Sequence, residues 1–87
     1  MAVYYVTGTI SRLYVSAEGC YIKLSGMSPS VKPKDGYFLL KLTHANYAAL
    51  YSLILSAAIN RYKIGIRTLN TISTSSYPEI TYILVDW

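Results

Sequence analysis

The sequence predicts a mostly β fold, a β-barrel with one helix. Only Ala45–Tyr62 has both the length and the three- and four-residue apolar spacing of a long helix. The other apolar stretches alternate with the two-residue period of strands, three before the helix and two after it. This order, β-β-β-α-β-β, matches the five-stranded OB-fold, and residues 1–87 are expected to form a single OB-fold domain. An open α+β sheet with the helix on one face is the alternative.

The first strand is predicted over Val3–Ser16 and is unusually long. One of its faces carries Tyr4, Val6 and Ile10. Leu13 and Val15 follow in the opposite phase, so Gly8 or the pair Ser11–Arg12 is expected to carry a bend or bulge. A long bent first strand is what a small closed barrel needs.

The remaining strands are predicted from their inward-facing apolar positions. These are Cys20, Ile22 and Leu24 in the second strand, Phe38, Leu40 and Leu42 in the third (Tyr37–Leu42), and Ile64 and Ile66 in the fourth (Lys63–Leu69). The last strand, Glu79–Trp87, has two apolar faces, which are Ile80, Tyr82, Leu84 and Ile83, Val85, Trp87. Such a strand is expected to be buried on both sides, more easily in an oligomer than in a monomer.

Two polar segments connect these elements. Gly26–Gly36, rich in Pro, Ser, Lys and Gly, is either a recognition loop or a plain connector. Asn70–Pro78 is predicted to be a polar connector before the last strand.

The predicted helix has more apolar surface than one sheet contact requires. The face expected to pack on the sheet carries Tyr47, Leu50, Tyr51, Ile54, Ala57 and Ala58. A flank beside it, with Ala49, Leu53, Ser56 and Asn60, has no charge between His44 and Arg61. Either the helix is deeply buried, or it meets its own copies in a homo-oligomer, because a chain this short offers little core around a helix. The residues predicted to lie in such an interface are Leu53, Ser56, Asn60, Ile83 and Val85.

Composition also favours self-association. Hydrophobic residues make up 53% of the chain and charged residues only 14%, where about 25% charged is usual. The net charge of +4 is scattered along the sequence, so a nucleic-acid surface would have to be assembled by folding. The single cysteine excludes an intrachain disulfide. No signal-peptide pattern and no membrane-span-length apolar run are found, so the chain is expected to be cytoplasmic as written, or secreted if a signal was removed.

Several short segments of the chain form a recognisable pattern. They are the run Tyr4, Tyr5, Ile10, Ser11, Leu13 and Val15, the pair Ile22 and Lys23, the residues Ile64, Ile66 and Arg67 after the helix, and Tyr77 and Pro78. This pattern resembles the B subunits of subtilase-cytotoxin and typhoid-toxin type AB5 toxins. The resemblance covers most of the chain at low identity. It implies a bacterial OB-fold pentamer whose helices line a pore, whose outer faces bind glycans, and which pairs with an A-type subunit. The chain lacks the family's cysteine pair, and Val6 replaces the serine that contacts sialic acid there.

Catalysis is not expected of this chain. Its only histidine, His44, begins the predicted helix, and its only cysteine, Cys20, faces the predicted core, so neither has a catalytic partner. The acidic residues have no metal-ligand spacing, and neither a metal nor a cofactor is expected. We therefore interpret the chain as a binding or assembly module.

A ligand is expected on the outer strand faces, because inward side chains fill a small barrel and the helix plugs one end. The outward residues that combine stacking surfaces with hydrogen-bond donors are Tyr14, Tyr21, Lys23, Arg67 and Tyr77. Together they suit a sugar ring or a carboxylate. Each one alone fits an ordinary solvated strand face better than a ligand contact, so the prediction concerns the group.

Three functions remain open from the sequence. The first is a ring-forming module that binds a glycan or another small polar ligand. The second is a single-stranded nucleic-acid-binding OB protein, whose stacking and phosphate contacts would come from Tyr21, Lys23, Tyr37, Lys41 and Arg67. The third is a structural or accessory subunit with no small ligand.

Overall fold

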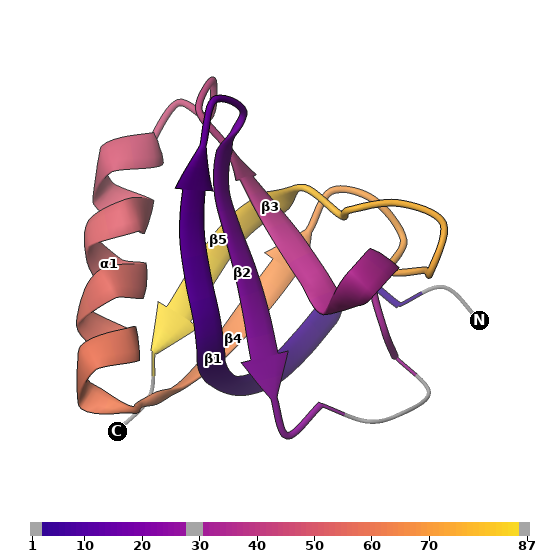
Figure 1. Ribbon diagram of the computed structural model, residues 1–87, viewed down its shortest axis with the longest axis horizontal. Helices are drawn as coiled ribbons and strands as arrows, with labels where there is room; N and C mark the ends of the chain where they lie inside the picture. The colour runs from indigo at the N-terminus through magenta and orange to yellow at the C-terminus, as the bar shows by residue number, and fades with distance from the viewer. Residues whose placement is uncertain (1–2, 28–30, 86–87) are drawn as a thin grey trace.

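Five strands and one helix make up the computed structural model, which describes residues 3–27 and 31–85 (Figure 1). Their order along the chain is the predicted one, and the helix begins two residues later than expected and ends two residues earlier. The elements are β1 (Tyr5–Ser16), β2 (Gly19–Ser25), a 3-10 turn (Lys34–Gly36), β3 (Tyr37–Lys41), α1 (Tyr47–Asn60), β4 (Lys63–Thr68) and β5 (Ile80–Val85).

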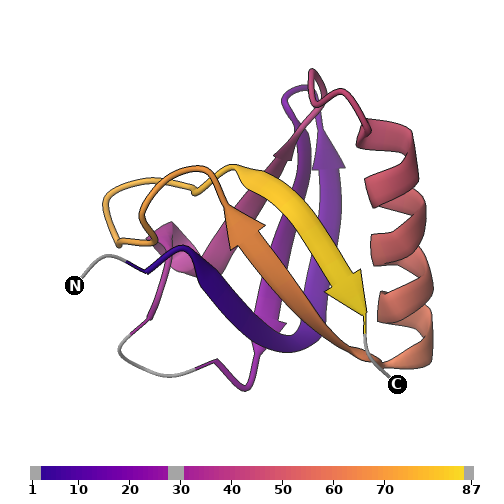
Figure 2. The ribbon, with the colours of Figure 1, turned by 180° about the vertical axis from the view of Figure 1, so that it is seen from behind.

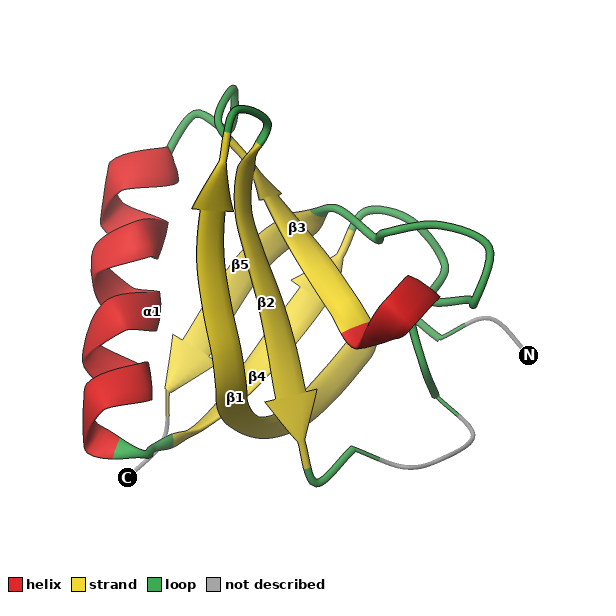
Figure 3. Cartoon of the chain, in the orientation of Figure 1, coloured by secondary structure: helices red, strands yellow, loops and turns green. Residues whose placement is uncertain are grey.

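The sheet has the strand order β3-β2-β1-β4-β5, and hydrogen-bonded neighbours are antiparallel. Its two edge strands approach each other where Leu39 and Glu79 form a parallel bridge. The Leu39 amide also donates to the Pro78 carbonyl oxygen at 3.0 Å. The sheet therefore curls into the partly open OB barrel that the sequence predicts, and it is not the open α+β sheet. Helix α1 stands along one side of this barrel and contacts β1 and β5 (Figure 3).

Strand β1 is bent by a bulge at Ser11, the second of the two positions that the sequence predicts. The pairing of β1 with β2 shifts register between Ile10 and Arg12, which leaves Ser11 as the extra residue. The first half of β1 pairs with β4, and from Thr9 onward β1 pairs with β2. Seen from both sides, the strand curves around the lower part of the barrel (Figures 1 and 2).

The core consists largely of the residues predicted to face inward. From the strands it contains Cys20, Ile22, Leu24, Phe38, Leu40, Ile64 and Ile66, and from the helix Leu50, Ile54 and Ala57. The inward positions predicted from the two-residue period of β2 and β4, and from the helical spacing of α1, are therefore confirmed. No helix in the described part of the chain is long and apolar enough to cross a bilayer.

The inward prediction for Leu42 is wrong, and β5 is not buried on both sides within the single chain. Leu42 is 57% exposed, because β3 ends at Lys41 and the chain turns there. The register between β4 and β5 shifts at Thr81, which is left as an extra residue in β5. Inward and outward residues of β5 therefore do not alternate strictly. As a result Ile80 is buried, while Tyr82 and Leu84 point outward and are 47% and 37% exposed. Trp87 lies outside the described residues.

The predicted interface residues are divided between core and surface. Ile83 is buried in the core, and Leu53 and Val85 are half-buried and pack against it. Ile83 therefore has almost no surface for a partner, which corrects the prediction. Ser56 and Asn60 are exposed on α1. The large apolar side chains that α1 leaves exposed are instead Leu55 (39%) and Ile59 (72%).

Candidate functional site

The outer face of β1, β2 and β3 gathers most of the predicted ligand residues. Cross-strand pairing aligns Tyr14 with Tyr21, and in the adjacent row it aligns Lys23 with Tyr37. Tyr77 reaches the same surface from the segment between β4 and β5. We call the four side chains Tyr14, Tyr21, Tyr37 and Tyr77 the tyrosine face.

The rings of the tyrosine face contact one another. Tyr14 stacks on Tyr21 with ring centroids 4.9 Å apart and an interplanar angle of 14°. Tyr37 meets the edge of Tyr14 at 5.4 Å, and Tyr77 meets Tyr21 at 5.3 Å and 77°. Stacked and edge-to-face pairs at these distances are the arrangements that aromatic rings favour. Tyr21 is consequently buried in the centre, whereas Tyr14 keeps 42% of its surface exposed and offers a ring to a ligand.

Two carboxylates are hydrogen-bonded to hydroxyl groups of the tyrosine face. Tyr21 Oη donates to Glu18 Oε1 at 3.1 Å, and Ser16 Oγ donates to the same oxygen at 3.1 Å. Tyr77 Oη donates to Asp35 Oδ2 at 3.1 Å. Burial, and then the bond to Glu18, raises the pKa of Tyr21, while the bond to Asp35 raises the pKa of Tyr77. Both phenols therefore stay protonated at neutral pH and keep donating.

Cations border the same surface. Lys23 Nζ lies 5.6 Å from the centroid of Tyr37, and Lys34 Nζ lies 5.1 Å from that of Tyr77. Arg12 Nη1 donates to Tyr37 Oη at 3.2 Å. The surface thus carries both signs of charge around an aromatic centre, with hydrogen-bond donors and acceptors within reach of one ligand.

Four of the five predicted ligand residues come together, and Arg67 does not. Tyr14, Tyr21, Lys23 and Tyr77 share the tyrosine face or its border, whereas Arg67 pairs with Tyr5 and lies 5.3 Å from the Tyr4 ring. Tyr5 and Tyr14 are nine residues apart on β1, which corresponds to about 30 Å along an extended strand. Both side chains point outward, but they do so from different sides of a bent strand.

Sequence reasoning did not include Tyr37 or Glu18 among the ligand residues of the sugar hypothesis. Tyr37 does appear in the nucleic-acid hypothesis, and it is an outward residue next to the inward Phe38. The antiparallel register that pairs it with Lys23 was the signal that placed it on this face. Glu18 had no such signal, because it lies in the turn between β1 and β2 and reaches the face only through its side chain.

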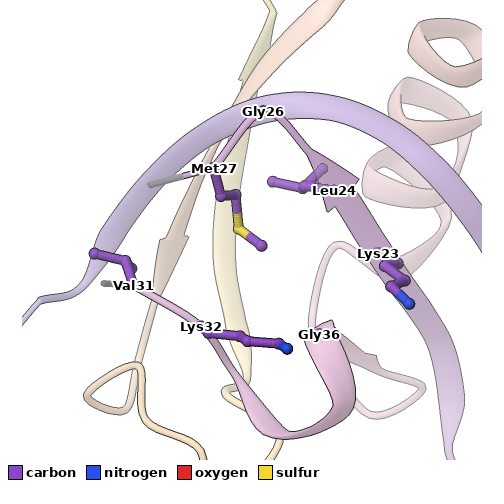
Figure 4. Close-up of a pocket in the computed structure, with 7 residues that line it drawn as sticks. All are labelled: Lys23, Leu24, Gly26, Met27, Val31, Lys32 and Gly36. Carbon is purple, nitrogen blue, oxygen red and sulfur yellow. The ribbon is translucent and has the colours of Figure 1, made fainter. Parts of the chain in front are cut away.

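A separate pocket of about 170 Å³ lies beside the Gly26–Gly36 loop (Figure 4). Leu24, Met27 and Val31 give it an apolar lining, and the side chain of Met27 extends into it. Lys23 and Lys32 supply its charge. The loop therefore has a hollow of its own, but the pocket is open and shares only Lys23 with the predicted ligand group.

Both candidate reactive residues are engaged in structural contacts. Cys20 is fully buried, and its Sγ is hydrogen-bonded with the Tyr47 hydroxyl at 3.0 Å. His44 Nδ1 accepts a hydrogen bond from the Asn46 amide at 3.0 Å, so its Nε2 carries the proton and donates to the Thr81 carbonyl oxygen at 2.9 Å. The histidine therefore ties the start of α1 to β5. Within residues 3–27 and 31–85, no group of three or more His, Cys, Asp and Glu is placed to hold a metal ion.

The contact between Cys20 and Tyr47 predicts a stability difference at high pH. The hydrogen bond with Cys20, and then burial, raises the pKa of Tyr47 to about 12. The folded-state pKa lies above the unfolded value of about 10, so the protonated Tyr47 hydroxyl makes its full contribution to stability below pH 10. This contribution is lost as the pH rises towards 12. Tyr47→Phe should therefore be about 1 kcal/mol less stable than the parent at pH 8. That gap should narrow between pH 10 and pH 11.5 in urea titrations, whereas a constant gap would show that the Tyr47 pKa is ordinary.

The chain matches no protein-family model, no curated protein and no solved structure at a significant level. The five-stranded barrel and the tyrosine face are thus the features from which its function has to be argued.

Proposed function

We propose that this chain is a non-enzymatic OB-fold binding module that assembles as a homo-oligomer and binds a neutral saccharide on the tyrosine face. The observation that carries the proposal is an aromatic cluster flanked by two oriented carboxylates, those of Glu18 and Asp35. The outer face of strands 2 and 3, with the loops after strands 1 and 4, is where OB-folds bind oligosaccharides and oligonucleotides. Glu18 and Tyr77 lie in those two loops.

The chemistry of the face suits a sugar. The exposed ring of Tyr14 can cover the C–H side of a pyranose, an apolar contact that leaves the sugar's hydroxyl groups at the rim. Within the described residues, Glu18 Oε2 and Asp35 Oδ1 accept no hydrogen bond from the protein, while the other oxygen of each carboxylate is bonded. Each free oxygen can therefore accept from a sugar hydroxyl. The same two charges would repel an acidic sugar, so the proposal specifies a neutral one.

A single-stranded nucleic acid is the second candidate. Lys23, Lys34 and Arg12 border the tyrosine face and favour it, because stacking beside cations is how OB-folds hold single strands. The carboxylates of Glu18 and Asp35 oppose it, since their negative charges beside the rings would repel phosphates. Binding to phosphates would also weaken steeply as salt is raised, and binding to a neutral sugar would not.

The proposal predicts that Tyr14→Ala weakens glycan binding by about tenfold or more, because the exposed stacking ring is lost. Hits from an array of neutral and acidic glycans would be titrated at two salt concentrations. Tyr14→Phe keeps the stacking ring and removes only the hydroxyl, so it should retain most of the binding that Tyr14→Ala loses. Tyr82→Ala is the matched control, because Tyr82 is 47% exposed but lies on β5, away from the tyrosine face.

Each alternative has its own result in this experiment. If oligonucleotides bind in a salt-dependent way and Tyr14→Ala abolishes that binding, the ligand of the tyrosine face is a nucleic acid and not a saccharide. Equal losses in Tyr14→Ala and Tyr82→Ala would show that the site lies elsewhere. Binding of neither ligand class would favour a structural or accessory subunit.

A further inference from the structure

A polar hollow lies on the other side of the barrel from the tyrosine face. It is independent of the proposed function. There β4 pairs with both β1 and β5, so that Gly65 sits between Thr7 and Leu84 in one cross-strand row. The next row contains Tyr5, Arg67 and Tyr82. Figure 2 shows β4 and β5 on the side of the molecule that faces away from the viewer in Figure 1.

The hollow exists because Gly65 has no side chain in a row where its neighbours have them. It has a volume of about 210 Å³ and is lined by Tyr5, Thr7, Lys63, Ile64, Gly65 and Leu84. The Tyr5 hydroxyl lies directly over Gly65, where a Cβ atom would collide with it. Tyr5 thus closes one side of the hollow and brings its hydroxyl to the floor.

The polar groups at this hollow are donors without an acceptor in the part of the chain that the structure describes. Within the described residues, neither the Tyr5 hydroxyl nor the Thr7 hydroxyl takes part in a hydrogen bond, and Lys63 forms no ion pair. None of the described lining residues is acidic. Two hydroxyls and an ammonium group around one space are suited to an anion, because charge-assisted hydrogen bonds to a carboxylate are stronger than neutral ones.

The rest of the lining is apolar, which restricts the kind of anion. Leu84 is 37% exposed beside the hollow and supplies its apolar side chain, since the side chain of the other apolar lining residue, Ile64, is buried in the core. The volume is below the roughly 300 Å³ at which pockets for drug-sized ligands begin. A ligand that uses every part of this lining is therefore small, with one anionic end and one apolar end.

We propose that the hollow over Gly65 binds a small carboxylic acid. Its carboxylate accepts hydrogen bonds from Tyr5, Thr7 and Lys63, and its apolar part packs against Leu84. Benzoate is a probe of this class, because it combines one carboxylate with one ring.

The test is an amide-resolved NMR titration of the full chain with benzoate. We expect saturable shifts at Thr7, Lys63, Gly65 and Leu84. Lys63→Gln should weaken binding about tenfold by removing the charge, and Tyr5→Phe should weaken it several-fold while keeping the ring that packs over Gly65. Lys32→Gln is the matched control, because Lys32 is an exposed cation that lines the separate loop pocket. Spectra of the free variants establish that each is folded.

Three further probes decide the ligand class. Benzyl alcohol and benzylamine keep the ring without the carboxylate and should shift these amides far less than benzoate does. Inorganic phosphate should bind more weakly than benzoate, since it cannot use Leu84. The proposal is overturned if benzylamine or phosphate binds as well as benzoate, if Lys63→Gln binds like the parent, or if benzoate causes no saturable shifts at these four amides.

Discussion

Gly19→Ala is expected to lower the free energy of unfolding by about 3 to 4 kcal/mol, a large part of what a domain of this size has. Gly19 begins β2 at φ 143°, a conformation that L side chains rarely adopt. A Cβ atom at this position would also run into the backbone carbonyl oxygen of Leu40 on β3. The main chain of β3 cannot move away from this Cβ without losing its hydrogen bonds to β2. The cost of backbone strain at Gly19 and the cost of the lost hydrogen bonds therefore add together.

Gly26→Ala separates these two contributions. Gly26 also has a positive φ of 82°, but no atom of residues 3–27 or 31–85 lies within 4 Å of the position that its Cβ would take. This control should cost only about 1 kcal/mol, from backbone strain alone. Urea denaturation of both variants provides the measurement. Equal losses of unfolding free energy in the two variants would mean that β2 and β3 are farther apart at Gly19 than in the structure.

The strand hairpin around Gly19 was among the features that sequence could predict. Period-two patterns located Cys20, Ile22 and Leu24 in the core, because a one-residue error would expose all three at once. The same logic placed Phe38 inward and so left Tyr37 outward. Residues whose direction is set by strand periodicity were therefore predictable, including most of the tyrosine face.

Features that depend on irregular backbone were not predictable to the residue. The shift opposite Thr81 exchanges the faces of β5, and nothing in an apolar strand indicates where an extra residue will be inserted. The bulge at Ser11 was foreseen only as one of two positions, and the bend of β1 separates Arg67 from Tyr14. Tyr77 joins the tyrosine face through a loop whose path no periodicity describes.

The proposed oligomer predicts that Ile59→Glu dissociates the assembly. The side chain of Ile59 is 72% exposed on α1, one helical turn from Leu55, and the described helix carries no charge along its length. If copies of α1 meet around an axis, each substitution places one carboxylate in the shared apolar contact, and identical charges repel one another there. The cost is several kcal/mol for each buried, unpaired charge. Light scattering should then give the 9.7 kDa monomer for Ile59→Glu and a multiple of that mass, about five-fold for a ring of five, for the parent.

The choice of Ile59 keeps dissociation distinct from unfolding. Leu53 and Val85 are less suitable positions for a charge, because both pack against the core and their substitution would destabilise the monomer itself. Leu69→Glu is the matched control, since Leu69 is 65% exposed just after β4 and not on the helix. It should leave the mass of the assembly unchanged, and circular dichroism should show all three proteins folded. A parent protein that is monomeric at micromolar concentration would refute the oligomer, and dissociation by Leu69→Glu alone would move the interface from α1 to the β4–β5 side of the barrel.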